Sequence, residues 1–428
     1  MLPISESISP SIPTVTENII LEPIQISEPV QREEPSLHVY SRRPRVTQQN
    51  QPSEPTSDPL QELQKEKSKV DDLDAPIAIR KGKVMKNFGY RQGQADHTLF
   101  VKESKNKKRC FLIVYVDDII ITGDDVDEIN NLKRLLQSEF KVKDLGKLQY
   151  FLGIEIARSK DGIFISQRKY ILELLQETAK LGCRPATTPI EKNWKEKLTE
   201  EDPPTNRERY QRIVGKLIYL SLTRPDIAYS VSQVSQFMHA PTIRHQNAVD
   251  QILRYLKGTP GKGMLYKKTK NRKIEEFTDA HWSNSKSTTG YCNKFWGNVV
   301  TWRSKKQSLV SRSSTEAEYR AIAQGICELI WLDRLLIELK IDVNGQLHLY
   351  SDSQPAIANV HNSIQHHRMK HVRIDRNFIK SKIESGKIKL SYAPSTDQEA
   401  DILTKALLRI SFESNVSKLG MIYIHSPT

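Results

Sequence analysis

Two adjacent carboxylates, Asp117 and Asp118, interrupt an apolar run in the middle of the chain. Six apolar residues, Phe111 to Val116, precede them and three isoleucines follow. Such runs predict two buried strands joined by a tight turn that holds both aspartates at its tip. Paired carboxylates suit hard divalent cations, which can activate a hydroxyl and stabilise a leaving oxygen in phosphoryl transfer. An exposed Asp-Asp turn between core strands is the alternative, because aspartate is a common turn former.

Four more acids stand at equivalent places in the C-terminal part. Asp279 and Asp352 end expected strands, whereas Glu318 and Asp401 fall in the first turns of expected helices. Strand ends and helix starts meet at one edge of an α/β layer, where ligands bind. Each acid taken singly is more often a cap or a surface charge than a ligand. The occurrence of all four acids in this order is much less expected by chance than any one of them, and it predicts a second carboxylate cluster.

Hydrophobic periodicity predicts the elements that position these acids. In the first half we expect helices at 126–140, 170–181, 210–238 (broken near Pro225) and 243–257, and strands at 148–159 and 162–167 beside the hairpin. In the second half we expect strands at 274–279, 287–301 (two), 347–352 and 387–392, and helices at 311–340, 372–384 and around Asp401.

Composition separates residues 1–76 from the rest of the 428-residue chain. This segment holds 11 of the 21 prolines, no glycine, and 7 basic against 13 acidic residues. It cannot bury enough apolar surface to offset its ordering entropy, so we expect it to be disordered. The remainder carries 58 basic and 38 acidic residues, which favours a polyanionic partner, nucleic acid before membrane.

Cysteine usage and hydropathy indicate an intracellular protein. The four cysteines show no paired spacing, so we expect reduced thiols and neither a disulfide framework nor a zinc site. No apolar run approaches the ~18 to 20 residues that cross a bilayer. The start, MLPISESISP, lacks a basic stretch and a long apolar core, so we expect no secretory signal.

The Tyr-Val-Asp-Asp sequence between its strands resembles the active-site hairpin of reverse transcriptases. From about residue 86 to the C-terminus the chain is similar to the Pol polyproteins of copia-class retrotransposons. The resemblance implies a polymerase palm in which Asp117 and Asp118 bind metal.

This resemblance also implies that the palm is truncated. In the family, a long segment with the fingers and the first palm strands separates two stretches that adjoin here near Lys83. A reverse transcriptase needs a third aspartate on one of those strands. The aspartates available upstream of Cys110 are Asp58, Asp71, Asp72, Asp74 and Asp96, and none lies where the family places its ligand. We therefore expect an incomplete polymerase site.

The C-terminal part resembles copia-type ribonuclease H through TDAHW, SSTEAEY, LYSDSQPAI and EADILTK. Carried over by motif, the resemblance implies the catalytic, metal-binding acids Asp279, Glu318, Asp352 and Asp401. Two Mg²⁺ ions (Mn²⁺ as an alternative) would serve hydrolysis of the RNA strand of an RNA–DNA hybrid. Glu316 is then a cap partner of the helix. His281 stands where the family usually has an acid, so we expect an altered rate or local charge.

A basic, histidine-rich segment follows these motifs. Its histidines, His361, His366, His367 and His371, lack a recognised zinc spacing and cysteine partners. We favour phosphate contacts by Arg368, Lys370 and Arg373.

The expected fold class is α+β and α/β: a partial palm, thumb and connection followed by a ribonuclease H-like mixed five-stranded sheet with flanking helices. The expected parts are a Pro-rich linker (1–76), a truncated palm (77–180), thumb and connection helices (181–268), the ribonuclease H-like domain (269–410) and a C-terminal tail (411–428). We expect residues 86–265 to be less stable than 270–410, because a palm without its first strands leaves an unpaired edge.

The leading hypothesis is a copia-type fragment that retains RNA hydrolysis and has lost DNA polymerisation. Its partners would be RNA–DNA hybrids and template-primer, in cytoplasmic virus-like particles or the nucleus. One alternative is a polymerase completed by a partner chain such as a full-length Pol product. Another is an inactive relic that binds nucleic acid through its charge.

Overall fold

The computed structural model describes residues 77–116, 118–140, 142–195, 201–341, 343, 345–361 and 373–423. All of them belong to one compact unit, Glu66–Thr428. The expected linker, Asp117, Arg368 and Lys370 lie outside the described residues, as does the side chain of Arg373.

The first sheet is antiparallel, with strand order β1-β2-β3-β4. Its strands are β1 (Arg91–Gln92), β2 (Leu99–Glu103), β3 (Arg109–Tyr115) and β4 (Asp118–Gly123). The expected hairpin is confirmed, because β3 and β4 pair from Cys110–Gly123 to Tyr115–Asp118. Helices α2 (Ile77–Asn87) and α3 (Val126–Glu139) contribute Met85 and Leu132 to its small core.

A second antiparallel sheet has the order β14-β8-β7-β6-β5. Its strands are β5 (Tyr150–Phe151), β6 (Ile154–Arg158), β7 (Gly162–Ser166), β8 (Lys262–Lys267) and β14 (Met421–Tyr423). Helix α11 (Arg409–Lys418) leads into β14. The segment 411–428, set apart as a C-terminal tail in the sequence analysis, contributes Phe412, Val416 and Met421 to a buried core.

The helical region holds α4 (Arg168–Glu177), α5 (Arg207–Leu220), α6 (Pro225–Val234), the short η1 (Ser235–Phe237) and α7 (Ile243–Gly258). The break at Pro225 is confirmed. A fully buried Arg224–Asp226 ion pair (2.7 Å) lies at this break, and Tyr255 donates to the same carboxylate at 2.6 Å. This network fixes the start of α6 against α7.

The third sheet is mixed and five-stranded, as expected, and its strand order is β11-β10-β9-β12-β13. Its strands are β9 (Ile274–His281), β10 (Thr288–Phe295), β11 (Asn298–Lys306), β12 (Leu347–Ser351) and β13 (Ile388–Tyr392). The helices around it are α8 (Ser314–Glu338), α9 (Gln354–His361), α10 (Arg373–Glu384) and the short 3₁₀ helix η3 (Glu399–Leu403). β9 runs antiparallel to β10 and parallel to β12.

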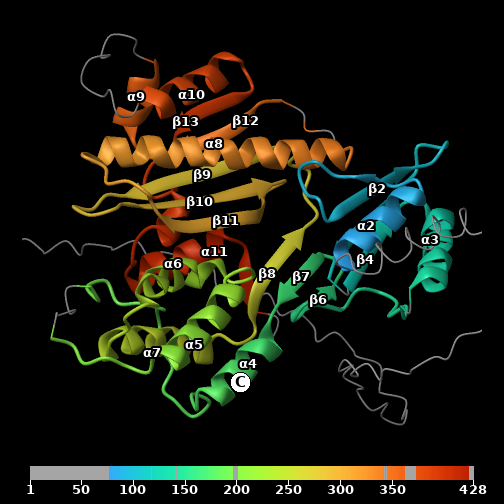
Figure 1. Ribbon diagram of the computed structural model, residues 1–428. Coiled ribbons are helices and arrows are strands. Elements are labelled where there is room, and N and C mark those ends of the chain that lie inside the picture. The colour runs from blue at the N-terminus through green and yellow to red at the C-terminus, as the bar shows by residue number, and fades with distance from the viewer. Residues whose placement is uncertain are drawn as a thin grey trace, which may run out of the picture. The chain divides into compact units, whose positions relative to one another are not determined.

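Two cores cover the opposite faces of this third sheet. Helix α8 lies along one face together with α9 and α10, whereas α6 and α11 lie on the other side (Figure 1). The core on the side of α6 and α11 is continuous from α4 to β14 and includes Cys292, Val299 and Leu403. Residues 268/269 therefore do not separate two hydrophobic cores, because the helices before them pack directly on the sheet that follows.

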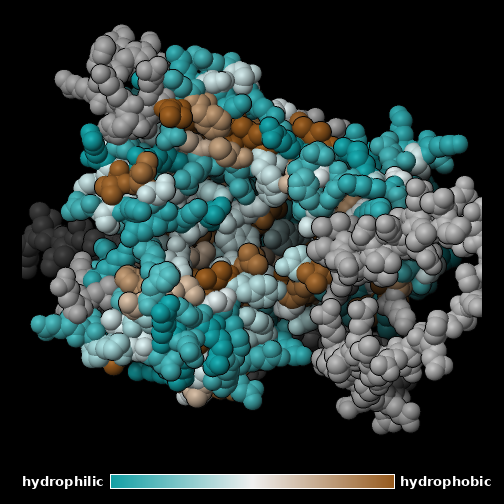
Figure 2. All heavy atoms as spheres, in the orientation of Figure 1, coloured by the Kyte–Doolittle hydropathy of each residue, from teal (hydrophilic) through white to brown (hydrophobic). Residues whose placement is uncertain are grey.

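The face shown in Figure 2 is largely hydrophilic, and its apolar side chains lie in small separate patches. Among the described helices, none has both the length and the apolar character needed to span a bilayer.

Candidate metal centre

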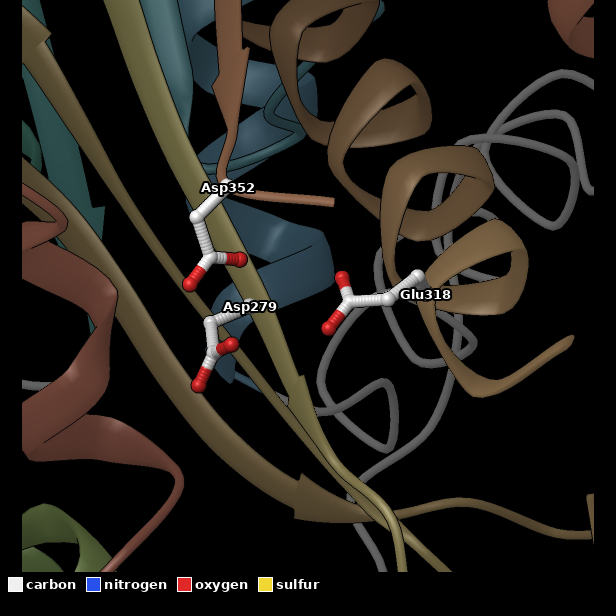
Figure 3. A group of neighbouring side chains, drawn as sticks. All are labelled: Asp279, Glu318 and Asp352. Atoms are coloured by element: carbon white, nitrogen blue, oxygen red, sulfur yellow. The ribbon is translucent and has the colours of Figure 1, made fainter. Parts of the chain in front are cut away.

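Three carboxylates from separate elements converge at one edge of the third sheet (Figure 3). Asp279 lies in β9, Glu318 near the start of α8, and Asp352 directly after β12. One oxygen from each lies within 4.8 Å of the others. The structure therefore brings together three of the four acids that the sequence singled out.

Strand register explains the approach of the two aspartates. β9 and β12 are parallel neighbours in which Phe277 is paired with Tyr350. Two residues further along each strand stand Asp279 and Asp352, and side chains two apart on a strand point to the same face. The register thus places both carboxylates side by side at the ends of their strands.

Helix α8 supplies the third carboxylate. Ser313 caps the helix by accepting from the Glu316 N–H (3.2 Å), and Glu316 accepts in turn from the Arg312 N–H (2.8 Å). Glu316 thus takes part in capping the helix, which is the role that the sequence predicted for it. Glu318 Oε1 accepts from the backbone N–H of Ala280 (3.1 Å), which fixes the carboxylate against β9.

Asp401, the fourth expected acid, lies beside the three in η3. Lys405 Nζ is 2.7 Å from Asp401 Oδ1 and 3.9 Å from Asp279 Oδ2. Thr404 donates a hydrogen bond to the same Asp279 oxygen, and Ser395 donates to Asp352 Oδ2 at 3.1 Å. Asp401 is thus linked to the cluster through a shared ammonium.

Burial and mutual repulsion shift Glu318, Asp352 and Asp401 toward their neutral forms. Burial raises the pKa of Glu318 well above its usual range, and the charges of Asp279 and Asp352 raise it further. The pKa of Asp401 rises to about 6, through burial first and the charge of Asp279 second, against the opposing effect of Lys405. The pKa of Asp352 is raised for the same two reasons, burial and Asp279.

The donor set fits a divalent cation. Glu318 Oε2 is buried and has no hydrogen-bond partner, and it lies next to two further carboxylates. Buried carboxylates that repel one another are unfavourable unless a cation compensates them. All the converging ligands are oxygens, which Mg²⁺ and related hard cations prefer.

The hairpin shows no comparable cluster in the part of the chain that the structure describes. Asp118 starts β4 and is exposed, and Asp117 is outside the described residues. Asp96 accepts from the Thr98 N–H and hydroxyl, both at 2.8 Å, so this upstream acid closes a local turn. An incomplete polymerase site stays a prediction, because Asp117 lies outside the described residues.

Two residues near the cluster were missed by the sequence reasoning. Lys405 lies four residues after Asp401, a spacing that predicts an ion pair on one side of a helical turn. Glu276 lies three residues before Asp279, is fully buried, and has no hydrogen-bond partner for either oxygen. An acid inside an expected strand gives no sign of which face it occupies when its neighbour, Glu275, is also acidic.

Fold and site together define the class of protein. A Tyr-Val-Asp-Asp hairpin is followed by a five-stranded mixed sheet with converging carboxylates, which is the arrangement of a reverse transcriptase fragment joined to a ribonuclease H-like module. Residues 64–192 match the family model described as "Reverse transcriptase (RNA-dependent DNA polymerase)".

Relatives identify the family. The chain is 42% identical over 338 residues to the retrovirus-related Pol polyprotein from transposon RE1 of Arabidopsis thaliana, covering 78% of this chain and 23% of that polyprotein. It is 30% identical to the putative transposon Ty5-1 protein of Saccharomyces cerevisiae, covering 57% of this chain and 82% of the relative. The chain belongs to the copia-type family of retrotransposon Pol proteins. It spans about a quarter of the length of the Pol polyproteins that it matches.

Among solved structures, the chain is similar to the foamy viral protease-reverse transcriptase in complex with RNA/DNA hybrid. That match has 13% identity and a TM-score of 0.40, and covers 66% of this chain and 36% of the other. At this TM-score the likeness adds nothing to what the sheet order shows.

Proposed function

We propose that this chain hydrolyses the RNA strand of RNA–DNA hybrids and does not polymerise DNA by itself. The catalytic acids would be Asp279, Glu318, Asp352 and Asp401, with Mg²⁺ as the cofactor and Mn²⁺ as a substitute. The observation that carries this proposal is the convergence of three carboxylates within 4.8 Å around a buried, unpartnered Glu318 oxygen. A family resemblance at the four acid motifs supports the choice of substrate.

The chain's own residues would hold and orient the reacting groups. When bound, two divalent cations supply a hydroxide nucleophile and stabilise the leaving 3′ oxygen. Asp279, Glu318 and Asp352 would be their ligands, and Asp401 would complete the set. Ala280 N–H keeps the Glu318 carboxylate facing β9, and the Thr404 hydroxyl holds one oxygen of Asp279. Both contacts pre-organise ligands before substrate arrives.

The decisive experiment is Mg²⁺-dependent cleavage of a labelled RNA strand within an RNA–DNA hybrid by the full chain. We expect Asp279→Asn to lower the cleavage rate by roughly 100-fold or more, because it removes a ligand charge from the cluster. The matched control is Asp333→Asn. Asp333 is also a buried acid, on the same helix as Glu318, but it is paired with Lys387 at 2.5 Å outside the cluster.

The control separates loss of chemistry from loss of fold. Asp333→Asn should lower the melting temperature and leave the cleavage rate per folded molecule unchanged. Equal, metal-independent cleavage by wild type and Asp279→Asn would overturn the proposal. Steeply salt-dependent binding of the hybrid without any cleavage would instead favour the inactive, nucleic-acid-binding relic.

A second candidate function is polymerisation completed by a partner chain, such as a full-length Pol product. Strand β4 begins at Asp118 and is bonded only to β3 among the described strands, so its other edge can accept a strand. Primer extension that requires both this chain and the partner would support complementation. Extension by this chain alone would contradict the incomplete site.

Phosphate contacts by Arg368, Lys370 and Arg373 remain part of the proposal. Replacing all three with Gln should weaken binding of hybrid and of template-primer to a similar degree, because backbone contacts read charge and not sequence. The plot of the logarithm of the binding constant against the logarithm of salt concentration should become less steep, by an amount that corresponds to the loss of up to about three phosphate contacts.

A further inference from the structure

The ammonium of Lys405 occupies the space between two carboxylates of the candidate metal centre. It lies 2.7 Å from Asp401 Oδ1 and 3.9 Å from Asp279 Oδ2. Both acids are buried, whereas a third of the lysine side chain remains exposed. An ordinary surface ion pair joins one cation to one exposed acid, so this arrangement is of a different kind.

The backbone fixes Lys405 in this place. The N–H groups of Thr404 and Lys405 both donate to the Asp401 carbonyl oxygen at 3.2 Å, which closes the turn after η3. The Thr404 side chain reaches Asp279 from the same turn. One turn thus presents a hydroxyl to Asp279 and an ammonium to both aspartates.

We propose that Lys405 is a resident counter-cation, and that a divalent cation must displace its ammonium to bind on the Asp401 side of the cluster. The inference rests on the proposed metal-dependent function. Mg²⁺ binds carboxylate oxygens at about 2.0–2.1 Å, so an ion shared by Asp279 and Asp401 would lie within a few ångströms of Nζ. Two cations at such a distance repel strongly in a partly buried site. Lys405 is in this sense a positioning residue that acts through the two aspartates.

Two consequences follow for the metal-free and metal-bound protein. Without metal, Lys405 offsets the repulsion between Asp279 and Asp401 and keeps both carboxylates in place. With metal, displacement of the ammonium opposes binding, so the affinity on this side is lower than the ligand set alone would give. Removing the charge should therefore destabilise the metal-free protein and strengthen its binding of Mg²⁺.

The test is calorimetric titration of Mg²⁺ into the full chain without nucleic acid, for wild type, Lys405→Gln and Lys405→Arg. We expect Lys405→Gln to lower the Kd for Mg²⁺ about tenfold, which corresponds to about 1.4 kcal/mol. Lys405→Arg keeps the charge and should stay within about twofold of wild type. The melting temperature in EDTA should fall for Lys405→Gln, and Mg²⁺ should raise it by more than it raises that of wild type.

The matched control is Lys294→Gln. Lys294 also neutralises a buried acid of η3, lying 2.5 Å from Glu399 Oε1, but it contacts neither Asp279 nor Asp401. This variant should lose stability in EDTA and keep the wild-type Kd for Mg²⁺. A tighter Kd in both lysine variants would show that general loss of positive charge, and not displacement of Lys405, sets the affinity, which would overturn the proposal.

A measurement on the wild-type protein avoids any effect of substitution on folding. Acylation of lysines by an amine-reactive reagent, followed by mass spectrometry, should show that Mg²⁺ increases labelling of Lys405 and leaves Lys294 unchanged. Unchanged labelling of Lys405, with equal Kd in wild type and Lys405→Gln, would overturn the counter-cation role alone. Failure of both proteins to bind Mg²⁺ would overturn the metal centre and, with it, the proposed function.

Discussion

Glu318 Oε1 accepts a hydrogen bond from the backbone N–H of Ala280, 3.1 Å away, and this contact ties α8 to the strand that carries Asp279. The second oxygen, Oε2, is buried without a partner. One carboxylate thus serves two purposes, because one oxygen fixes the helix and the other remains for a ligand. Replacing Glu318 by a neutral residue should therefore raise the stability of the metal-free protein and weaken its binding of metal.

Glu318→Gln tests this opposition. Because burial raises the pKa of Glu318, the folded protein retains a proton that the unfolded chain loses above about pH 4.3. The free energy of unfolding without metal should therefore fall as pH rises above that value. The substitution should flatten this dependence and raise the stability at pH 8 by about 1–3 kcal/mol. Urea unfolding in EDTA at pH 5 and pH 8 measures both.

Addition of Mg²⁺ should make wild type the more stable of the two proteins at pH 8, the reverse of their order in EDTA. Wild type should gain stability with Mg²⁺ at pH 8, whereas Glu318→Gln should gain little because one ligand charge is gone. A Gln variant that is stabilised by Mg²⁺ as much as wild type would show that Glu318 is not a ligand.

Glu276 of β9 lies directly against Gly325 of α8. A Cβ added to Gly325 would lie 1.7 Å from Glu276 Oε1, and the fully buried carboxyl cannot turn out to solvent. Gly325→Ala should therefore cost about 1–3 kcal/mol through overpacking. In a Glu276→Ala background the same change should stabilise by about 0.5–1 kcal/mol, because alanine is the better helix former. Denaturant unfolding of wild type, the two single variants and the double variant measures whether the effect of Gly325→Ala on the free energy of unfolding changes sign.

The same pair also predicts a dependence on pH. Burial, and then the charge of Glu328, raise the pKa of Glu276 well above its usual range, so the native state is less stable at higher pH. Glu276→Ala should reduce the loss of stability between pH 5 and pH 8. If Gly325→Ala destabilises both backgrounds equally, the contact with Glu276 is not the cause.

Local pattern predicted most elements of this fold, because each one carries its own signal. The isoleucine-rich hairpin, the periodic helix α7 ending at Gly258, and the Pro225 break all follow from short stretches of sequence. The three cluster acids were found in the same way, since strand ends and helix starts are local features. Asp401 was placed in a regular helix, whereas the structure has a 3₁₀ turn of five residues.

Long-range pairing was the part that local pattern did not reveal. β8 and β14 are short, and they are bonded to each other although more than 150 residues separate them. Gly263 weakens the strand signal of β8, and the three residues of β14 are too few to be recognised as a strand from composition alone. Gly263 is required because a side chain there would meet the Ile165 carbonyl at 2.3 Å. Such a requirement is visible only once the partner strand is known.

Protection from hydrogen exchange should change at a different boundary from the one between 86–265 and 270–410 that the sequence suggests. The first sheet has its own small core, and among the described strands β4 is paired on one side only. Helices α5 to α7 share the large core with the third sheet. Amides of β4 should therefore exchange faster than those of α7 and β9, which should be protected to a similar degree. Equal protection of β4 and β9 would contradict this division.

Deletion of residues 409–428 tests the structural role of the C-terminal segment. β14 covers the edge of β8 through the pairs Met421–Met264 and Tyr423–Lys262, and α11 buries Phe412 against Tyr255 with ring centroids 5.5 Å apart. The deletion would uncover an edge strand and open the core around the buried Arg224–Asp226 pair. We expect a loss of stability of at least about 3 kcal/mol, and aggregation on concentration.

A milder variant separates these two effects. Phe412→Ala removes the aromatic contact and leaves β14 paired, so it should cost about 3–5 kcal/mol without promoting association. The matched surface control is Ile410→Ala on the same helix, where the side chain is 84% exposed and its loss should change stability by less than about 0.5 kcal/mol. Thermal unfolding combined with light scattering distinguishes loss of core from exposure of an edge. If the protein that lacks residues 409–428 has the same melting temperature as wild type, the last twenty residues do not stabilise the fold. The β8–β14 pairing and the Phe412 contact would then both contribute nothing measurable.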